Sequence, residues 1–201
     1  PNLYNSVNYS FTIGVSDGSN VVNRVFNLTM AGVVPDSISY SVPGTYSWVV
    51  PTGVTYIDAS LIAGGGAGGG GANNVNWVNV AASSGGGGGA GGAASGKLTV
   101  TPGETLTINV GAAGVAGAAN TKGGDGGLSA VKRGATTLLS CTGGIGGSPG
   151  SVGAVTATLG GNGGVGNYFT GGKGGNGAAI SNDGQGEHYY ATSQAGDGVT
   201  G

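Results

Sequence analysis

Charged side chains are scarce in this chain. They make up 7% of its 201 residues, with 6 Lys and Arg against 8 Asp and Glu, so the formal net charge is −2. A protein that binds nucleic acid carries a basic patch or stripe that neutralises phosphates. Six basic residues do not supply such a surface, and we expect no nucleic acid partner.

Cysteine and long apolar runs are also lacking. The single cysteine, Cys141, excludes an internal disulfide framework, and its apolar segment 138–141 predicts a buried, inert thiol. No run of 18 or more apolar residues occurs, so we expect no membrane insertion. The chain opens at Pro1 without Met or a signal-like segment, and we interpret it as a piece of a longer polypeptide.

The residues that usually carry catalysis are few. His188 is the only histidine, and no serine can be placed beside it from spacing alone. The acids Asp125, Asp183, Glu187 and Asp197 stand in or near glycine-rich turns, where Asp is usually a turn former. A glycosidase needs two carboxylates at a defined separation, and no spacing here indicates such a pair. We therefore expect no enzyme activity, no cofactor and no metal site.

Glycine is what the chain has in abundance, with 50 positions. Through 143–177 it returns at every third residue, as in 144, 147, 150 and 153, then 160, 163 and 166, then 171, 174 and 177. A period of three fits neither an α-helix nor a strand, but it fits polyproline-II geometry with three residues per turn. Such a helix has no internal hydrogen bonds, so its N–H and C=O groups must find partners on neighbouring helices. We infer a bundle of glycine helices side by side.

Flexible glycine-rich linker is the alternative interpretation of these runs. Ordering one residue costs about 1–2 kcal/mol, and glycine lies at the high end of that range. However, the runs recur, are short, and alternate with apolar or β-branched segments inside one domain. This alternation favours an ordered bundle over a linker.

Residues 8–30 predict a β-hairpin. Tyr9, Phe11, Ile13 and Val15 alternate with polar or small residues, a turn segment follows at 16–20, and Phe26, Leu28 and Met30 alternate again. The pattern over about 25 residues resembles the last two strands of immunoglobulin-like or cadherin-like repeats in bacterial and phage surface proteins. Two strands alone make no stable sandwich, so either further strands lie before Pro1 or the hairpin pairs with a neighbouring subunit.

Residues 44–150 contain further strand segments. Segment 44–55 reads as strand, Pro-x-Gly turn and strand, followed by an apolar strand at 56–63 and a glycine run at 64–71. Two more hairpins are expected, one over 96–111 turned by Pro102-Gly103, and one over 128–141 turned near Arg133-Gly134. This order resembles a glycine-rich module common in phage tail fibres and tail tips.

Beyond Thr142 the chain resembles the tip adhesins of T-even-type long tail fibres, in which a polyglycine sandwich carries variable loops. The likeness is one of pattern, and it implies architecture and role rather than individual contacts. We predict an all-β plus polyglycine-II fold with essentially no α-helix. It begins with an immunoglobulin-like hairpin segment (1–42), continues with a module of β-strands and glycine runs (43–142), and ends in a bundle of left-handed glycine helices with exposed loops (143–201).

The loops between glycine runs combine aromatic side chains with Asn, Ser and Gly, as antibody recognition loops do. Loops on a rigid scaffold are also where binding residues gather. Any single aromatic could instead cap the end of the bundle. The candidate receptor-binding residues are Asn73, Asn74, Asn76, Trp77, Asn79, Tyr168, Phe169, Glu187, His188, Tyr189 and Tyr190.

These features lead to a hypothesis of a virion protein, the receptor-binding tip of a phage tail or tail fibre. Its partners would be a host surface protein or glycan and other tail subunits, with a homotrimer as one possible assembly. Three alternatives stay open: a structural spacer or decoration of an appendage, an ice-binding protein, and a bacterial surface adhesin.

Overall fold

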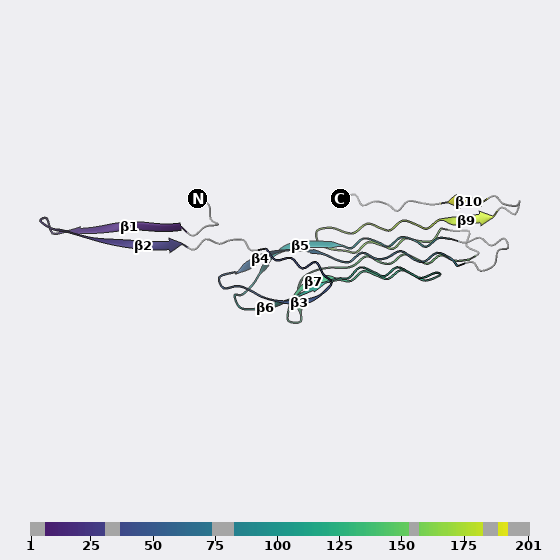
Figure 1. The fold of residues 1–201 in the computed structure, drawn as a ribbon, viewed down its shortest axis with the longest axis horizontal. Coiled ribbons are helices and arrows are strands. Elements are labelled where there is room, and N and C mark those ends of the chain that lie inside the picture. The colour runs from purple at the N-terminus through teal and green to yellow at the C-terminus, as the bar shows by residue number, and fades with distance from the viewer. Residues whose placement is uncertain (1–6, 31–36, 74–82, 153–156, 183–188, 193–201) are drawn as a thin grey trace. The chain divides into compact units, whose positions relative to one another are not determined.

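A computed structural model describes residues 7–30, 37–73, 83–152, 157–182 and 189–192. The chain divides into two compact units, Pro1–Ser39 and Tyr40–Gly201. The described residues form ten β-strands and no helix, so the predicted all-β class is confirmed, and antiparallel pairing runs throughout (Figure 1). None of them forms a helix long and apolar enough to cross a bilayer.

The first unit is a two-stranded antiparallel sheet of β1 (Val7–Ser16) and β2 (Val21–Met30). Its turn is held by Asp17, whose carboxylate accepts hydrogen bonds from the backbone N–H groups of Ser19 and Asn20 at 2.9 and 2.7 Å. These bonds lower the pKa of Asp17. The hairpin predicted over 8–30 is therefore confirmed.

In the second unit, the sheets at the start of the glycine-rich segments pack on each other. One has the order β3-β6-β7-β8, and the other is the pair β4-β5. Their bounds are β3 Gly44–Val49, β4 Tyr56–Ile62, β5 Ala93–Thr99, β6 Thr105–Val110, β7 Ser129–Arg133 and β8 Thr136–Cys141. Val50, Val100, Leu106 and Val131 form the core between the sheets, with Leu106 fully buried.

The prediction of a hairpin over 96–111 is wrong in its pairing. A turn does form at Pro102-Gly103, and Gly103 has a φ of 82°. However, β5 pairs with β4, and β6 pairs with β3 and β7, so the turn passes from one sheet to the other. This crossing buries Val100 and Leu106 on facing sides of the core. The hairpin of β7 and β8, turned at Gly134, agrees with prediction.

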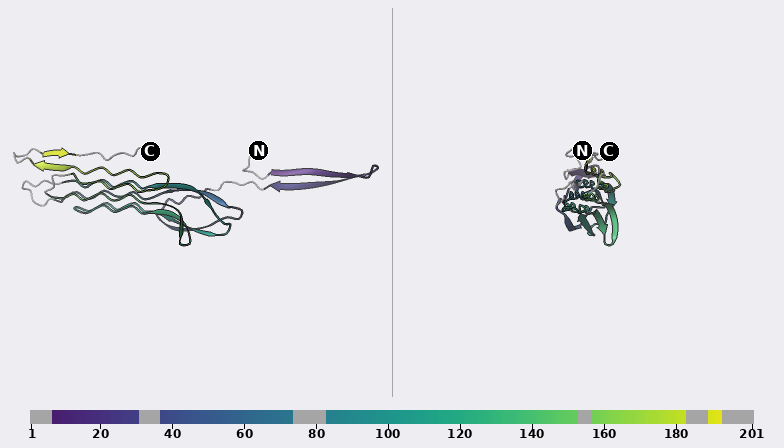
Figure 2. Two further views of the ribbon diagram at one scale, coloured as in Figure 1. Left: turned by 180° about the vertical axis from the view of Figure 1, so that it is seen from behind. Right: turned by 90° about the vertical axis from the view of Figure 1, so that its right-hand side faces the viewer.

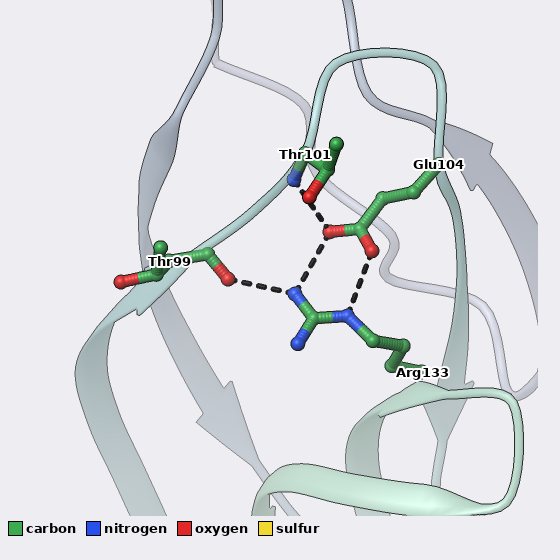
Figure 3. Close-up of polar contacts among 4 residues, drawn as sticks. All are labelled: Thr99, Thr101, Glu104 and Arg133. Atoms are coloured by element: carbon green, nitrogen blue, oxygen red, sulfur yellow. Dashed lines mark hydrogen bonds and ion pairs between the residues drawn. The ribbon is translucent and has the colours of Figure 1, made fainter.

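An ion pair joins the turn between β5 and β6 to the end of β7. Arg133 donates from Nε and Nη2 to the two carboxylate oxygens of Glu104 at 2.7 and 2.8 Å, and Nη2 also donates to the carbonyl of Thr99 (Figure 3). The backbone N–H of Thr101 donates to the same carboxylate at 2.9 Å. These donors lower the pKa of Glu104, and the carboxylate raises that of Arg133.

Glycine-rich segments continue directly from one end of the sheets. β4, β6 and β8 each lead into such a segment, and β5 and β7 each follow one. Figure 1 shows these segments extending side by side from the strands, and the right panel of Figure 2 shows them stacked when seen nearly end-on. We call them runs 1 to 7, with the bounds 64–72, 83–92, 111–119, 122–127, 142–150, 158–166 and 171–178, and together the glycine array.

Candidate functional site: the glycine array and its ends

Backbone hydrogen bonds join the runs at every third residue. In run 1, the N–H groups of Gly64, Ala67 and Gly70 donate to the carbonyls of Gly127, Gly124 and Thr121 in or beside run 4. The N–H groups of Gly66, Gly69 and Ala72 donate to the carbonyls of Gly89, Gly86 and Ser83 in run 2. All six distances lie between 2.8 and 3.0 Å. A residue three positions along a run therefore repeats the same bond to the same neighbour.

The same bonds give the arrangement of the runs. Run 1 bonds to runs 2, 3, 4 and 5, and run 2 bonds to runs 1, 5, 6 and 7. Within the described residues, run 3 bonds to runs 1 and 4 alone. Runs on both sides of position 142 belong to one array, since run 5 donates to run 1 through Gly144, Gly147 and Gly150.

Close approach of the backbones explains the glycine content. A Cβ built on Gly66 or Gly69 would lie within 3.0 Å of carbonyl oxygens in run 5, a distance that real Cβ atoms essentially never show. A Cβ on Gly68, one residue away, would meet its nearest atom at 3.6 Å, an ordinary contact. None of the described glycines with φ between +20° and +160° lies in a run. Most run glycines are thus required by lack of space and not by an unusual φ.

The side chains of Asp125 and Asn176 accept hydrogen bonds from backbone N–H groups of neighbouring runs. Asp125 accepts a hydrogen bond from the backbone N–H of Gly146 at 2.8 Å and pairs with Lys122 at 2.6 Å, and these contacts lower its pKa, Lys122 having the larger effect. Asn176 accepts from the N–H of Gly160 at 3.0 Å. The expectation that Asp125 stands in or near a turn is wrong, because it lies within run 4 and its carboxylate replaces a backbone acceptor there.

One end of the array, which we call the loop end, is defined by Ala72, Ser83, Asn120, Ser151, Thr158 and Ala178. The turn between runs 3 and 4 lies here, with Asn120 at a φ of 58°, a conformation that Asn tolerates better than most residues. The Asn120 side chain accepts a hydrogen bond from the backbone N–H of Asn73 at 3.1 Å. This contact places Asn73, one of the predicted recognition residues, at the loop end.

The opposite end, the sheet end, holds Tyr168 and Phe169. Phe169 and Ala93 of β5 exchange backbone hydrogen bonds at 3.0 Å, and the Asn167 side chain bonds to both backbone groups of Ser95. Phe169 is half-buried, whereas Tyr168 is 77% exposed. The connection 167–170 therefore extends the β4–β5 sheet and lies at the other end of the runs from Asn73.

The remaining predicted recognition residues are placed in part. Tyr189 and Tyr190 lie in β10 (Tyr189–Thr192), which pairs with β9 (Ala179–Asn182) directly after run 7 at the loop end. Asn74, Asn76, Trp77, Asn79, Glu187 and His188 lie outside the described residues. Their role in binding stays a prediction.

The residues that close the ends of the runs are not among the candidates predicted from the sequence. The side chains of Ser83, Ser84 and Thr158 bond to backbone groups of neighbouring segments at the loop end, and Thr142 and Ser129 do so at the sheet end. Ser, Thr and Asn at the borders of glycine runs were the available signal, because short polar side chains satisfy backbone groups where regular structure ends.

Cys141 is buried, as predicted, and desolvation raises the pKa of its thiol, which lowers its reactivity. No group of three or more His, Cys, Asp or Glu residues that could hold a metal ion is found in the part of the chain that the structure describes.

Comparison with known proteins gives a family and no individual relative. No curated protein and no solved structure matches the chain. A family model described as "Glycine-rich domain" matches residues 40–201, the same residues that form the second compact unit. The chain therefore belongs to the glycine-rich domain family.

Proposed function

We propose that the glycine array is a bundle of left-handed polyglycine-II helices that acts as a rigid scaffold for recognition loops. Polyproline-II geometry has three residues per turn and no internal hydrogen bonds. The three-residue spacing of the bonds between runs supports this geometry, as does the close approach of their backbones. Because each run is bonded to its neighbours along its length, the positions where connections leave the array are fixed.

On this scaffold we propose an adhesin, the receptor-binding tip of a phage tail or tail fibre that contacts a host surface protein or glycan. The observation that carries the proposal is the bonding of the run ends at the loop end, from which the connection containing Trp77 and the hairpin containing Tyr189 and Tyr190 leave. Aromatic residues held on a rigid base lose little conformational entropy on binding. Several copies per particle would raise modest single-site affinity by multivalency.

The test is an exchange of loops in the assembled particle. Residues 74–79 and, separately, 183–190 are replaced by Gly-Ser sequences of equal length, and adsorption to host cells is measured. The proposal expects adsorption to fall at least tenfold in one or both exchanges, with particle assembly unchanged. Unchanged adsorption and host range in both exchanges would reject a receptor-binding role.

A structural spacer is the second candidate, and the connection 167–170 favours it. Its residues extend the β4–β5 sheet. Phe169 forms an antiparallel β-bridge with Ala93, and the Asn167 side chain hydrogen-bonds to the backbone of Ser95. If the other connections serve the same purpose, loop exchange will leave adsorption intact. Substitutions that break the array will then prevent assembly.

We further propose that β1 and β2 are the last two strands of an immunoglobulin-like sandwich. On one face Phe11 stacks on Phe26, and Tyr9, Val15 and Leu28 are 48, 69 and 55% exposed. A two-stranded sheet with such a face is marginally stable in water and needs an apolar partner layer. A synthetic peptide of residues 1–39 should then lack strand structure by circular dichroism. A cooperative thermal transition of this peptide would contradict the proposal.

A further inference from the structure

The loop end of the array converges on two adjacent serines. Ser83 is 3% exposed, accepts a hydrogen bond from Ala72 through its carbonyl, and donates its N–H to the carbonyl of Ser151 at 3.2 Å. Its hydroxyl oxygen accepts from the N–H of Ser151 at 3.0 Å. Ser83 thus ties the end of run 1 to the end of run 5.

Ser84 makes the corresponding contacts to two other chain segments. Its N–H donates to the carbonyl of Ala178 at 2.8 Å, and its hydroxyl oxygen accepts from the N–H of Ala178 at 2.7 Å. Its carbonyl accepts a hydrogen bond from the hydroxyl of Thr158, whose own carbonyl accepts from the N–H of Gly177. Ser84 thus ties the start of run 6 to the end of run 7.

The space around these serines is closely filled. A Cβ on Gly150 would lie within 3.0 Å of the Ser83 carbonyl oxygen, and a Cβ on Gly177 would lie within 3.0 Å of the Ser84 carbonyl oxygen. The segments that meet here cannot shift far without losing these bonds or colliding. Two consecutive residues therefore fix four positions at which the chain enters or leaves the array: Ala72, Ser151, Thr158 and Ala178.

We propose that Ser83 and Ser84 are positioning residues that hold these four positions in one frame, so that the ligand surface at this end joins Asn73, beyond run 1, to Val152, beyond run 5. The inference rests on the proposed recognition function for its biological meaning. It excludes Tyr168 and Phe169 from that surface, because they lie at the sheet end.

The test measures a distance and needs no ligand. In a Cys141→Ser background, spin labels are attached through Asn73→Cys and Val152→Cys, two exposed positions directly beyond run 1 and run 5. The distance distribution is recorded for this reference, for Ser83→Ala with Ser84→Ala, and for Thr142→Val. The last variant is the control, because the Thr142 hydroxyl accepts a 2.7 Å bond from the N–H of Val165 at the sheet end.

The expected result is one narrow distance peak in the reference and in Thr142→Val, and at least a twofold wider peak in the double serine variant. The unfolding temperatures of the double serine variant and of Thr142→Val are measured alongside. If both temperatures fall by a similar amount, the wider peak of the serine variant is not a general effect of destabilisation. Equal widths in all three proteins would overturn the proposal, as would a reference peak already as wide as that of the serine variant. Adsorption is a separate readout, so failure of the receptor hypothesis leaves the distance result interpretable.

Discussion

At the scale of single residues, the position within a triplet decides which side chain the array accepts. Run 3 bonds to runs 1 and 4, and its triplets hold one glycine each, at 111, 114 and 117, followed by Ala or Val. Runs 1 and 2, with neighbours on more sides, are mostly glycine and otherwise hold only Ala and Ser. The glycine content of a triplet therefore follows the number of sides on which another backbone approaches.

A pair of adjacent substitutions tests this rule. Gly69→Ala should destabilise the protein by about 1–3 kcal/mol, as overpacking of a filled interior does, because its Cβ would collide with run 5. Gly68→Ala should be neutral or stabilise by about 0.4–1 kcal/mol, because the site has room and alanine restricts the unfolded chain. Urea unfolding measures both free energies. Equal effects of the two substitutions would contradict the rule.

The ion pair of Glu104 and Arg133 makes a prediction about pH. The pKa of Glu104 is lowered in the folded protein, by Arg133 first and by the Thr101 N–H second, from an ordinary value of 4.5. A lowered carboxyl pKa adds stability that is present above the unfolded-state pKa and is lost as the pH falls through the folded-state pKa. The free energy of unfolding should therefore fall below about pH 4.5, and less steeply in Glu104→Gln. Identical pH profiles for the two proteins would show that this carboxylate is not involved.

At the scale of elements, the junction between strands and runs is held by Ser129. Its hydroxyl donates to the carbonyl of Ile62 at 2.8 Å and accepts from the N–H of Gly111 at 3.0 Å, and the residue is 2% exposed. One side chain thus joins the start of β7 to the points where β4 and β6 pass into runs 1 and 3.

Removing this hydroxyl leaves two backbone groups without their partner. Ser129→Ala should cost about 1–3 kcal/mol, the range for unsatisfied buried polar groups. The matched control is Ser140→Ala on β8, an exposed serine, which should change stability by less than about 0.5 kcal/mol. Thermal unfolding measures the stability of both variants. If Ser140→Ala loses as much stability as Ser129→Ala, the Ser129 hydroxyl does not hold the junction.

Sequence patterns predicted which residues form strands better than they predicted which strands pair with each other. The alternation of Tyr9, Phe11 and Ile13 and the turn at Asp17 were enough for the first hairpin, because both arms and the turn are local. Alternation around Pro102-Gly103 predicted the arms correctly but not their separation into two sheets. A two-residue period shows which residues face a core, but the strands that pair with these two arms, β3 and β4, come from residues 44–62, far away in sequence.

For the candidate site, the glycine period indicated that backbones lie close together, but it could not order the runs. The placement of the connections depends on that order. Run 1 ends and run 2 begins at the loop end, so Asn73 lies there. Run 6 ends and run 7 begins at the sheet end, so Tyr168 lies there. Loops of similar composition therefore lie at opposite ends, which composition alone does not show.

At the scale of the whole molecule, the second compact unit is expected to fold without the first. The family match and the second unit share the same bounds, 40–201. A chain of residues 40–201 should therefore keep the unfolding midpoint that the full chain shows for its main transition. A drop in this midpoint, or loss of cooperativity, would show that residues 1–39 stabilise the array.

The central claim is that the glycine runs are bonded to one another through their backbones, and amide hydrogen exchange by NMR tests it most directly. Run 1 gives the clearest pattern, because 64, 66, 67, 69 and 70 donate to neighbouring runs, while the N–H groups of 65, 68 and 71 have no backbone acceptor among the described residues. We predict slow exchange at these five donors and fast exchange at residues 65, 68 and 71. Fast exchange throughout 64–71 would contradict it, and the runs would then be tethers rather than a scaffold.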